Sequence, residues 1–299
     1  MNVIITIGIC MHNCEKTLPK ALESINDSDF PHEKIELILV DDGSSDRTLK
    51  IAETYASKNN IQTKIFKTNW HGVASARTLI LNNANGEFIM WLDSDEALTP
   101  TYISKQVEFM EKNPDVAITA GIVAFVPRNL LLNLELTPDI VKRVLFDRSS
   151  SFFWKNRRLI GTGGSTFRIK ALRQVGGFDS KFKEGSEDID VVLRIQKLGW
   201  QIKINDGVFY EFHNGMSTIV DLLRKYYLYG YSSYQLYIKN KNAFSLFRMT
   251  PLPSFLFGIL IASKAYKLFY KKYFFLLPFH FSFKMIGWIF GFIHSQRKN

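Results

Sequence analysis

Short apolar runs alternate along the first 92 residues with segments in which apolar residues recur every three or four positions. Runs rich in β-branched residues, such as Val3-Ile4-Ile5-Thr6-Ile7-Gly8-Ile9, are typical of buried parallel strands. The pattern predicts strands over residues 3–9, 35–40, 62–67 and 87–92, and helices over residues 17–25, 47–57 and 73–83. This close alternation favours an α/β fold, with a mostly parallel sheet flanked by helices.

The pattern is less regular beyond Pro100. A helix is expected over residues 102–113, where Pro114 ends it, and a strand over residues 116–126. Farther along, the sequence predicts a loop over 148–158, a tight glycine-containing segment over 161–165, a strand over 166–169, helices over 171–175 and 187–198, and one or two strands over 201–212.

Polar clusters follow three of the predicted strands, at residues 10–13, 41–46 and 93–96. Ligands of open α/β sheets bind beyond the carboxyl ends of the strands, so these clusters are candidate binding residues. The first strand is not followed by a glycine-rich dinucleotide fingerprint, and the sequence has no phosphate loop ending in Gly-Lys-Ser/Thr. A nucleotide bound here therefore needs another group to neutralise its phosphates.

Asp93 and Asp95 follow the strand predicted over residues 87–92. In extended backbone, residues two apart point to the same side, and two carboxylates on one side favour a bound cation. Oxygen ligands suit Mg²⁺ or Mn²⁺, which also bind diphosphate oxygens. The alternative is an acidic turn that caps a helix beginning near Thr99.

Asp42 ends the second predicted strand. A carboxylate there can accept a hydrogen bond from the N–H of a base or from a ribose hydroxyl. The segment Asp42-Gly43-Ser44-Ser45-Asp46 is also good turn chemistry, with Asp46 capping the helix that follows. Both interpretations can hold, for different aspartates.

Glu187, Asp188 and Asp190 open a predicted helix, where carboxylates are stabilised by the helix N-terminus. Arg194 lies four residues after Asp190, so these two residues are expected to pair. Asp188 is left without a helical partner and is a candidate general base. His213 follows the last predicted strand; a lone histidine is more often structural, but neutral imidazole is also a good third metal ligand beside two carboxylates.

These motifs together resemble a known family. The carrying segments are Val40-Asp41-Asp42-Gly43-Ser44-Ser45-Asp46, Ala76-Arg77 with Gly86-Glu87-Phe88-Ile89, Leu92-Asp93-Ser94-Asp95, Gly176-Gly177-Phe178-Asp179, and Glu187-Asp188-Ile189-Asp190 with Arg194. Their order and spacing over residues 2–215 are similar to those of the family 2 inverting glycosyltransferases with the GT-A fold. The resemblance implies a GT-A type nucleotide-diphospho-sugar transferase fold and a single in-line displacement at the anomeric carbon.

The resemblance also implies a role for each matching residue. Nucleotide-binding residues would be Cys10, His12, Asp42, Arg77 and Ser94; metal ligands for Mn²⁺ or Mg²⁺ would be Asp95, Asp93 and His213; acceptor-side residues would be Gly163, Gly164 and Glu187; and Asp188 would be the catalytic base. The donor would be a nucleoside-diphosphate sugar, with a UDP-sugar favoured over a GDP-sugar. The chain departs from the family where the first strand ends in Cys10-Met11-His12-Asn13 instead of a Thr/Pro-x-Tyr-Asn-like segment, and His12 would stack on the base in place of tyrosine.

Residues 219–299 have a different composition. They hold 12 of the 38 Lys and Arg residues and 12 of the 25 Phe residues, but one of the 28 acids, so the net charge of +10 arises there. Basic residues among large apolar ones suit an anionic membrane surface better than a nucleic acid. We therefore expect a catalytic domain over residues 1–218 and a helical membrane-association region over 219–299.

Within that region, residues 251–263 and 273–293 are apolar. His280, Lys284, Gly287, Gly291 and His294 would form one narrow polar or small stripe on a helix, with large apolar residues around the rest. This pattern favours an interfacial helix or shallow helical hairpin on the cytoplasmic face of the cell membrane, and a sugar or lipid-linked acceptor. The alternatives are a hairpin of two short spanning helices, or a soluble helical region whose apolar face is covered in a dimer.

Other functions and sites fit less well. A nucleotidyltransferase would need a basic glycine-rich loop after the first strand, and residues 12–16 contain no glycine; a non-catalytic sugar- or lipid-binding module would need no general base. Cys10 and Cys14 lack a second pair at zinc-ligand spacing, so reduced thiols are expected. The N-terminus does not have the pattern of a signal peptide.

Overall fold

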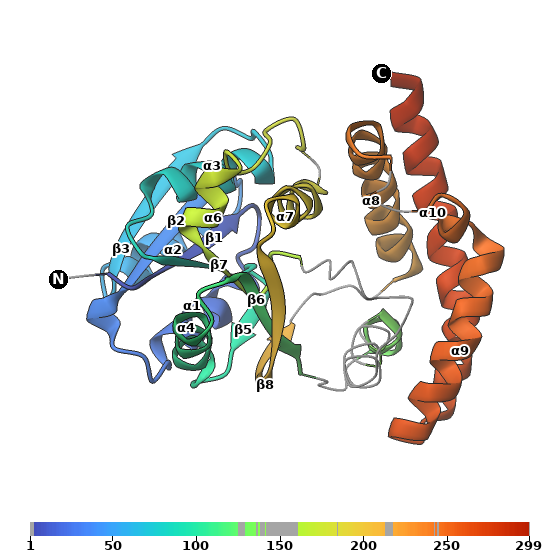
Figure 1. Ribbon diagram of the computed structural model, residues 1–299, viewed down its shortest axis with the longest axis horizontal. Coiled ribbons are helices and arrows are strands. Elements are labelled where there is room, and N and C mark those ends of the chain that lie inside the picture. Colours follow the sequence, from blue (N-terminus) through green and yellow to red (C-terminus); the bar gives the residue numbers. More distant parts are fainter. Residues whose placement is uncertain are drawn as a thin grey trace. The chain divides into compact units, whose positions relative to one another are not determined.

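The computed structural model describes residues 3–124, 129–135, 137, 141, 161–183, 185–212, 218–241, 243 and 245–298. The chain forms two compact units (Figure 1). We call Met1–Ala124, Arg157–Lys183 and Glu187–Asn214 the sheet unit, and Phe125–Asn156, Glu184–Ser186 and Gly215–Asn299 the helical unit. The boundary expected at residue 218 stays a prediction. Residues 129–135, far ahead of it in sequence, belong to the helical unit.

The sheet unit is built on one mixed sheet. Its strands are β1 (Ile5–Met11), β2 (Ile35–Asp42), β3 (Gln62–Thr68), β4 (Phe88–Trp91), β5 (Glu96–Leu98), β6 (Val116–Val123), β7 (Ser165–Arg168) and β8 (Gln201–Phe212), in the spatial order β3-β2-β1-β4-β7-β6-β8-β5. β1 to β4 are parallel, as are β6 and β8, whereas β7 is antiparallel to both its neighbours and β5 is antiparallel to β8. The expectation of a mostly parallel α/β sheet is confirmed.

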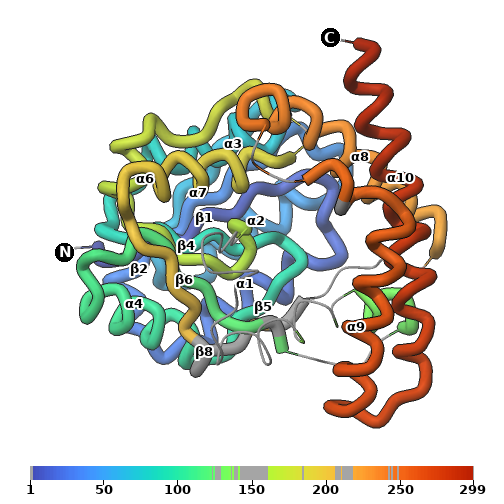
Figure 2. The backbone as a smooth tube through the Cα atoms, turned by 45° about the vertical axis from the view of Figure 1, so that its right-hand side comes forward, coloured from blue at the N-terminus to red at the C-terminus, as the bar shows by residue number. Residues whose placement is uncertain are grey.

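Helices cover both faces of this sheet (Figure 2). They are α1 (Leu18–Asn26), α2 (Thr48–Ala56), α3 (Val73–Asn83), α4 (Tyr102–Lys112), α6 (Ile169–Gln174) and α7 (Glu187–Lys197). The apolar residues of α1, α2 and α4 pack with alternate residues of β1, β2 and β4 in one core cluster. On the other face Gly8 leaves room for Ile80 of α3, because a Cβ at Gly8 would lie 2.8 Å from that side chain. β1, β2 and β4 are therefore buried on both sides, which explains their near-continuous apolar sequences.

The helical unit contains three long helices, α8 (Ile219–Lys239), α9 (Pro251–Phe269) and α10 (Leu277–Lys298), with short 3-10 turns at Phe247–Met249 and Lys272–Leu276. Thr218 begins α8 with a capping box, in which its side chain accepts from the Asp221 backbone N–H and the Asp221 carboxylate accepts from Thr218. Leu134 and Val141 pack with apolar residues of α9 and α10. The segments Pro251–Phe269 and Lys272–Lys298 are long and apolar enough to cross a membrane, by length and composition alone.

Candidate active site

Arg77 lies at the centre of a cluster of acidic side chains in the sheet unit. It projects from α3, and its guanidinium donates through Nη1 to Glu187 at the start of α7 and through Nη2 to Asp93 after β4, at 3.3 Å. The rings of Trp91 and Phe178 each lie 5.9 Å from the guanidinium carbon. Burial alone would lower the pKa of Arg77, but the carboxylates of Glu187 and Asp93 outweigh burial and raise it. The side chain is therefore a fixed positive charge that joins three elements.

Two carboxylates at the N-terminus of α7 share this site with Arg77. Burial raises the pKa of Glu187 to about 7 against the opposing effect of Arg77, and nearby Asp188 adds to the increase. Among the described residues, no partner is found for the buried Glu187 Oε2. Burial also raises the pKa of Asp188, whose Oδ1 accepts a hydrogen bond from the Ile189 N–H at 2.7 Å. A carboxylate with a raised pKa and a second oxygen beside Gly161 has the properties of a general base.

Asp93 and Asp95 lie on a turn, and the extended geometry assumed from the sequence is wrong. The Glu96 N–H donates to the Asp93 carbonyl at 3.0 Å, and the chain reverses here because β5 begins at Glu96 and pairs with β8. The buried Glu96 carboxylate accepts from the Asp93 N–H at 3.1 Å. Burial and Asp93 raise the pKa of Glu96 well above its usual value. Glu96 thus belongs to the site. The sequence analysis includes it in the polar cluster of residues 93–96 but assigns it no individual role.

The glycines expected on the acceptor side lie against this turn. A Cβ at Gly163 would lie 2.5 Å from Oε1 of Glu96 and 3.1 Å from Oδ2 of Asp93, so a larger residue cannot be placed without moving a carboxylate. Gly164 has φ +59°, and a Cβ there would lie 2.8 Å from the Tyr210 ring. Tyr102 donates to the Gly164 carbonyl and fixes this segment to α4. The structure therefore brings Gly163 and Gly164 to the predicted metal turn.

The turn carries two carboxylates, Asp93 and Asp95, whose oxygen atoms are of the kind that a divalent cation prefers. Asp93 and Asp95 are both partly exposed, and Arg77 pairs with Asp93 and Glu187 of this acidic cluster. Carboxylate oxygens are the donors that Mg²⁺ and Mn²⁺ prefer. No group of three His, Cys, Asp or Glu side chains is close enough to hold a metal among the residues that the structure describes. His213, the expected third ligand, lies outside them.

The expected nucleoside residues occupy the ends of β1 and β2. His12 is exposed, and its Nδ1–H donates to the Asp42 carbonyl at 2.8 Å while its Nε2 accepts from Asn13 Nδ2 at 3.1 Å, which holds the ring in one orientation. Burial raises the pKa of the Cys10 thiol to about 12. Ser94 hydrogen-bonds the side chain of Cys14. His12 is thus exposed at the end of β1, and its stacking on a base stays a prediction.

The Asp42 carboxylate is engaged by its own chain. It accepts hydrogen bonds from the Thr68 hydroxyl and the His71 N–H, each at 2.9 Å, and from the Gly72 N–H at 2.8 Å. Gly72 has φ +89° and packs against the Lys183 backbone. In this structure the Asp42 carboxylate therefore holds the loop between β3 and α3. Arg77 projects from α3.

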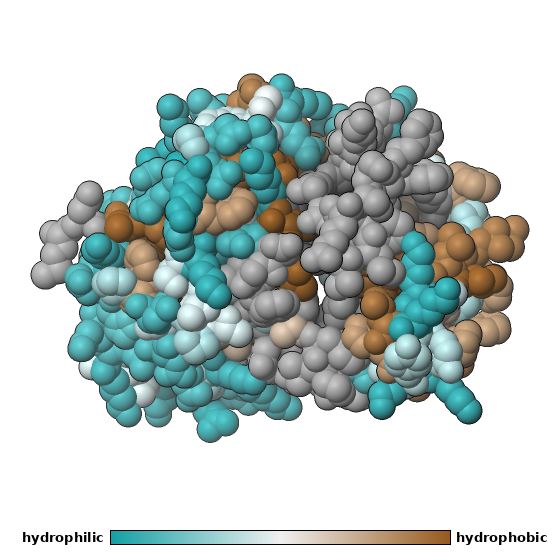
Figure 3. Space-filling view, turned by 60° about the horizontal axis from the view of Figure 1, so that its bottom comes forward, coloured by the Kyte–Doolittle hydropathy of each residue, from teal (hydrophilic) through white to brown (hydrophobic). Residues whose placement is uncertain are grey.

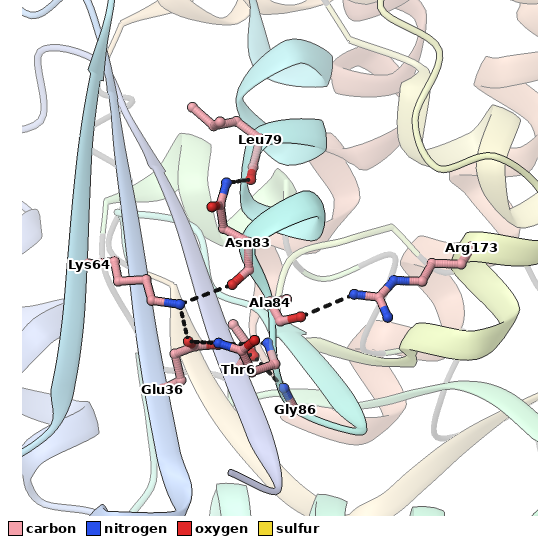
Figure 4. Close-up of polar contacts among 9 residues, drawn as sticks. Thr6, Glu36, Lys64, Leu79, Asn83, Ala84, Gly86 and Arg173 are labelled. Carbon is pink, nitrogen blue, oxygen red and sulfur yellow. Dashed lines mark hydrogen bonds and ion pairs between the residues drawn. The ribbon is translucent and has the colours of Figure 1, made fainter.

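A buried carboxylate elsewhere in the sheet unit shows the contrast with this site. Glu36 of β2 accepts hydrogen bonds from Thr6 at 2.9 Å, Lys64 at 2.6 Å and Asn85 at 2.6 Å (Figure 4). Burial would raise the pKa of Glu36, but these donors lower it. The carboxyl groups of Glu187, Asp188 and Glu96 have raised pKa values because their burial is not compensated in this way, which is typical of functional sites.

Two surface grooves of the sheet unit lie away from the acidic cluster. One of about 700 Å³ lies between α1 and α2 and includes Glu15, Arg47 and Tyr55, and another of about 540 Å³ includes Glu87 and Arg173. Neither is lined by the site residues, so chemistry and not groove size identifies the candidate site.

Comparison with known proteins gives consistent matches. Residues 6–176 match the family model described as Glycosyl transferase family 2. The poly(ribitol-phosphate) beta-N-acetylglucosaminyltransferase TarS of Staphylococcus aureus is 33% identical over 102 residues, which are 34% of this chain and 18% of TarS. The cholesterol galactosyltransferase of Borreliella burgdorferi is 27% identical over 236 residues, 74% of this chain and 64% of that protein. The matched regions thus span less than two thirds of these relatives.

Two solved structures resemble the whole chain in fold. The mannosyltransferase PcManGT from Pyrobaculum calidifontis, in complex with GDP-Man and Mn²⁺, has a TM-score of 0.69 at 15% identity, covering 100% of this chain and 88% of that one. S. aureus TarS 1–349 in complex with UDP-GlcNAc has a TM-score of 0.55 at 16% identity, covering 99% and 93%. At these identities the likeness concerns the fold alone.

Proposed function

The chain belongs to glycosyl transferase family 2 and has a GT-A type fold, and from that premise we propose that it transfers a sugar from a nucleoside-diphosphate sugar to a hydroxyl group with inversion of configuration. The observation that carries the proposal is the cluster of Arg77, Asp93, Glu187 and Asp188 at the carboxyl ends of the strands, where ligands of such sheets bind. The acceptor would be a glycan or a lipid-linked acceptor.

The donor would occupy the ends of β1, β2 and β4. The exposed His12 ring offers a face for stacking on the base, and Arg77 offers positive charge toward the diphosphate. TarS with UDP-GlcNAc and PcManGT with GDP-Man support a nucleoside-diphosphate sugar as the donor class. We favour a UDP-sugar over a GDP-sugar.

Asp95 and Asp93 would hold Mn²⁺ or Mg²⁺, with His213 as a further ligand. A bound divalent ion supplies positive charge that stabilises a departing diphosphate. The buried Glu96 holds the Asp93 backbone, so it positions the turn and does not have to bind the ion itself. The Mn²⁺ in the PcManGT complex supports this assignment.

Asp188 would act as the base. It takes the proton of the acceptor hydroxyl as that oxygen forms a bond to the anomeric carbon and the diphosphate leaves. Gly163, Gly164 and Glu187 would line the acceptor side. Only the carboxylate form of Asp188 can accept a proton, and burial raises the pKa of this group. On acidification, the rate of transfer is therefore expected to fall at a pH above the pKa of an ordinary aspartate.

The proposal also places the enzyme on the cytoplasmic face of the cell membrane. A membrane surface suits a lipid-linked acceptor, and the cholesterol galactosyltransferase is a relative whose name includes a lipid acceptor. The apolar segments Pro251–Phe269 and Lys272–Lys298 of the helical unit support this location by length and composition.

A donor screen tests the reaction class. Thermal shift of the full-length protein is measured with UDP- and GDP-sugars, with Mn²⁺ and with excess chelator, and the donors that stabilise it are then tested for sugar release and transfer. We expect release that depends on the ion, and a transferred product whose anomeric configuration, read by NMR, is opposite to that of the donor. Retained configuration would refute the single displacement, and full activity in excess chelator would refute the metal assignment.

A further inference from the structure

One side of α10 exposes large apolar residues, while the polar residues His280 and Lys284 are buried on another side, together with Phe281, Met285 and Trp288. Phe279, Phe283, Ile286, Phe290 and Ile293 are between 39% and 66% exposed, and their spacing of four, three, four and three residues places them on one side of the helix. His280 and Lys284 on the other side are at most 8% exposed. A helix of a water-soluble unit has the opposite arrangement.

α9 also exposes large apolar residues, and its Phe255 ring lies 5.3 Å from the ring of Phe279 of α10. Its residues Leu252, Leu256, Ile259 and Leu260 are between 47% and 70% exposed, whereas Ser254 and Gly258 are buried. We call these four residues and the five of α10 the apolar face. Figure 3 shows hydrophobic side chains gathered at the right-hand edge, where α9 lies in Figure 1. A group of nine large apolar residues exposed on two neighbouring helices is typical of an interaction surface.

The buried side of α10 contains an ion-pair network. The Glu135 carboxylate accepts from His280 Nε2 at 3.0 Å and from Lys284 Nζ at 3.4 Å, and Lys225 of α8 lies 3.6 Å away. Lys284 also donates to the Tyr226 hydroxyl at 2.8 Å. The helical unit therefore buries charged side chains and exposes apolar ones, which is the reverse of a water-soluble protein. Such an arrangement is stable where the surrounding medium is not water.

Small residues let α8 and α10 pack backbone to backbone. A Cβ at Gly230 of α8 would lie 1.8 Å from the Trp288 carbonyl, and one at Gly291 of α10 would lie 1.8 Å from the Tyr227 carbonyl. Gly287 and Gly291 are four residues apart on α10, with Ser295 another four residues on. This small-xxx-small spacing is typical of helix pairs in lipid, where apolar burial gives little drive to associate.

Positive charge flanks the apolar face at both ends. Lys264, Lys267, Lys271 and Lys272 surround the connection from α9 to α10, and Lys239, Lys241, Arg297 and Lys298 lie at the C-terminal ends of α8 and α10. A spanning orientation would put one of these basic groups on the far side of the membrane, against the bias of lysine and arginine toward one side. An orientation in the plane of the membrane leaves both groups beside anionic headgroups.

We propose that the apolar face of α9 and α10 lies in the plane of an anionic lipid leaflet, with the basic groups at its two ends on the headgroups. This extends the proposed function, since it specifies the membrane partner and its docking surface, but it does not depend on the chemistry at Asp188. The charge complementarity at both ends selects a lipid surface over a second copy of this chain.

Vesicle flotation of the full-length protein tests the partner. Binding to vesicles with about one third anionic lipid is expected to exceed binding to neutral vesicles and to weaken with salt. Leu260→Asp is expected to weaken binding at least about tenfold, since burial of a leucine side chain is lost. Leu198→Asp, at an equally exposed leucine of the sheet unit (56% against 62%), is the matched control and is expected to leave binding unchanged.

A second variant protects the test against a folding defect. Lys271→Glu with Lys272→Glu changes two exposed residues and is expected to weaken binding to anionic vesicles at least about tenfold while leaving the weak binding to neutral vesicles as it was. Equal binding of the wild type to both kinds of vesicle would overturn the proposal. A dimer in solution that does not bind vesicles would also overturn the proposal, because a second copy of the chain would then cover the apolar face.

Labelling of a cysteine at position 271 tests the orientation. In sealed inverted membrane vesicles, with the unsubstituted chain as background, the Lys271→Cys variant is expected to react with an impermeant maleimide added on the side of the sheet unit. Reaction only after detergent would show a spanning hairpin and overturn the in-plane orientation. Donor hydrolysis measured on the same samples separates the two proposals: hydrolysis without vesicle binding overturns this one alone, and binding without hydrolysis overturns only the proposed reaction.

Discussion

Glu187→Gln is the substitution whose effect follows most directly from the acidic cluster. The pKa of Glu187 is about 7, against an ordinary value of 4.5, because the carboxyl group is buried beside Asp188. Between these two pH values the folded chain holds a proton on Glu187 that the unfolded chain has lost. The free energy of unfolding must therefore fall as the pH rises through this window, and become level above it.

The magnitude follows from the same two pKa values. One pKa unit corresponds to about 1.4 kcal/mol, so the full window from pH 4.5 to pH 7 amounts to about 3 kcal/mol for this one group. Between pH 5 and pH 7.5 the wild-type chain should lose about 2 kcal/mol more than Glu187→Gln, whose amide does not titrate. Glu96 titrates in the same direction in both proteins, whereas Asp188 interacts with the Glu187 charge, so the difference belongs to the Glu187–Asp188 pair.

Urea unfolding of the full-length protein at pH 5 and pH 7.5 measures this difference, in mild detergent and excess chelator so that neither vesicles nor metal ions contribute. Glu53→Gln, at an exposed glutamate of α2, is the matched control and should follow the wild type at both pH values. If Glu187→Gln loses as much stability as the wild type between the two pH values, Glu187 does not carry the proton and the account of the cluster is wrong.

Three further substitutions test separate parts of the structure. Gly163→Ala puts a Cβ within 2.5 Å of Glu96 Oε1, so turnover of the donor should fall at least about tenfold, since misplaced catalytic groups lose that much or more, while urea unfolding changes by less than about 2 kcal/mol. Gly291→Val puts side-chain atoms where the Tyr227 carbonyl lies, so α8 and α10 can no longer pack closely. The share of the protein that stays soluble in detergent should fall and the share in aggregates should rise. Glu135→Gln leaves the buried Lys284 and the partly buried Lys225 without their carboxylate, so thermal unfolding in detergent should show a loss of about 3–5 kcal/mol; an unchanged transition would refute the network.

The fold could be predicted wherever its cause is local. The helix over residues 73–83 agrees with α3 at both ends, since its periodicity and its flanking residues lie within the segment itself. β5 was missed because it has three residues and is defined by pairing with β8, more than 100 residues later in the chain. For the same reason the antiparallel direction of β7 has no signature in its own sequence.

The contacts of the site could likewise be predicted only where their cause is local in sequence. The Asp190–Arg194 pair is confirmed at 2.8 Å, because a spacing of four residues on a helix fixes the contact. The Arg77–Glu187 pair joins residues 110 positions apart, so no spacing rule reveals it. Asp42 lies at the end of a strand, where a nucleoside ligand is expected. Its carboxylate nevertheless accepts hydrogen bonds from Thr68 and Gly72, which come close to it only when the chain folds.

The most direct test of the central claim is turnover of the donor by Asp188→Asn, beside Asp115→Asn at an exposed aspartate of the sheet unit. The raised pKa of Asp188 and its place beside Arg77 and Gly161 support our proposal that it is the base of the reaction. We predict that Asp188→Asn binds the donor as the wild type does, by calorimetry, but transfers sugar roughly 10²–10⁴-fold more slowly, as for loss of a general base. Near-normal transfer by Asp188→Asn would contradict the assignment of the active site.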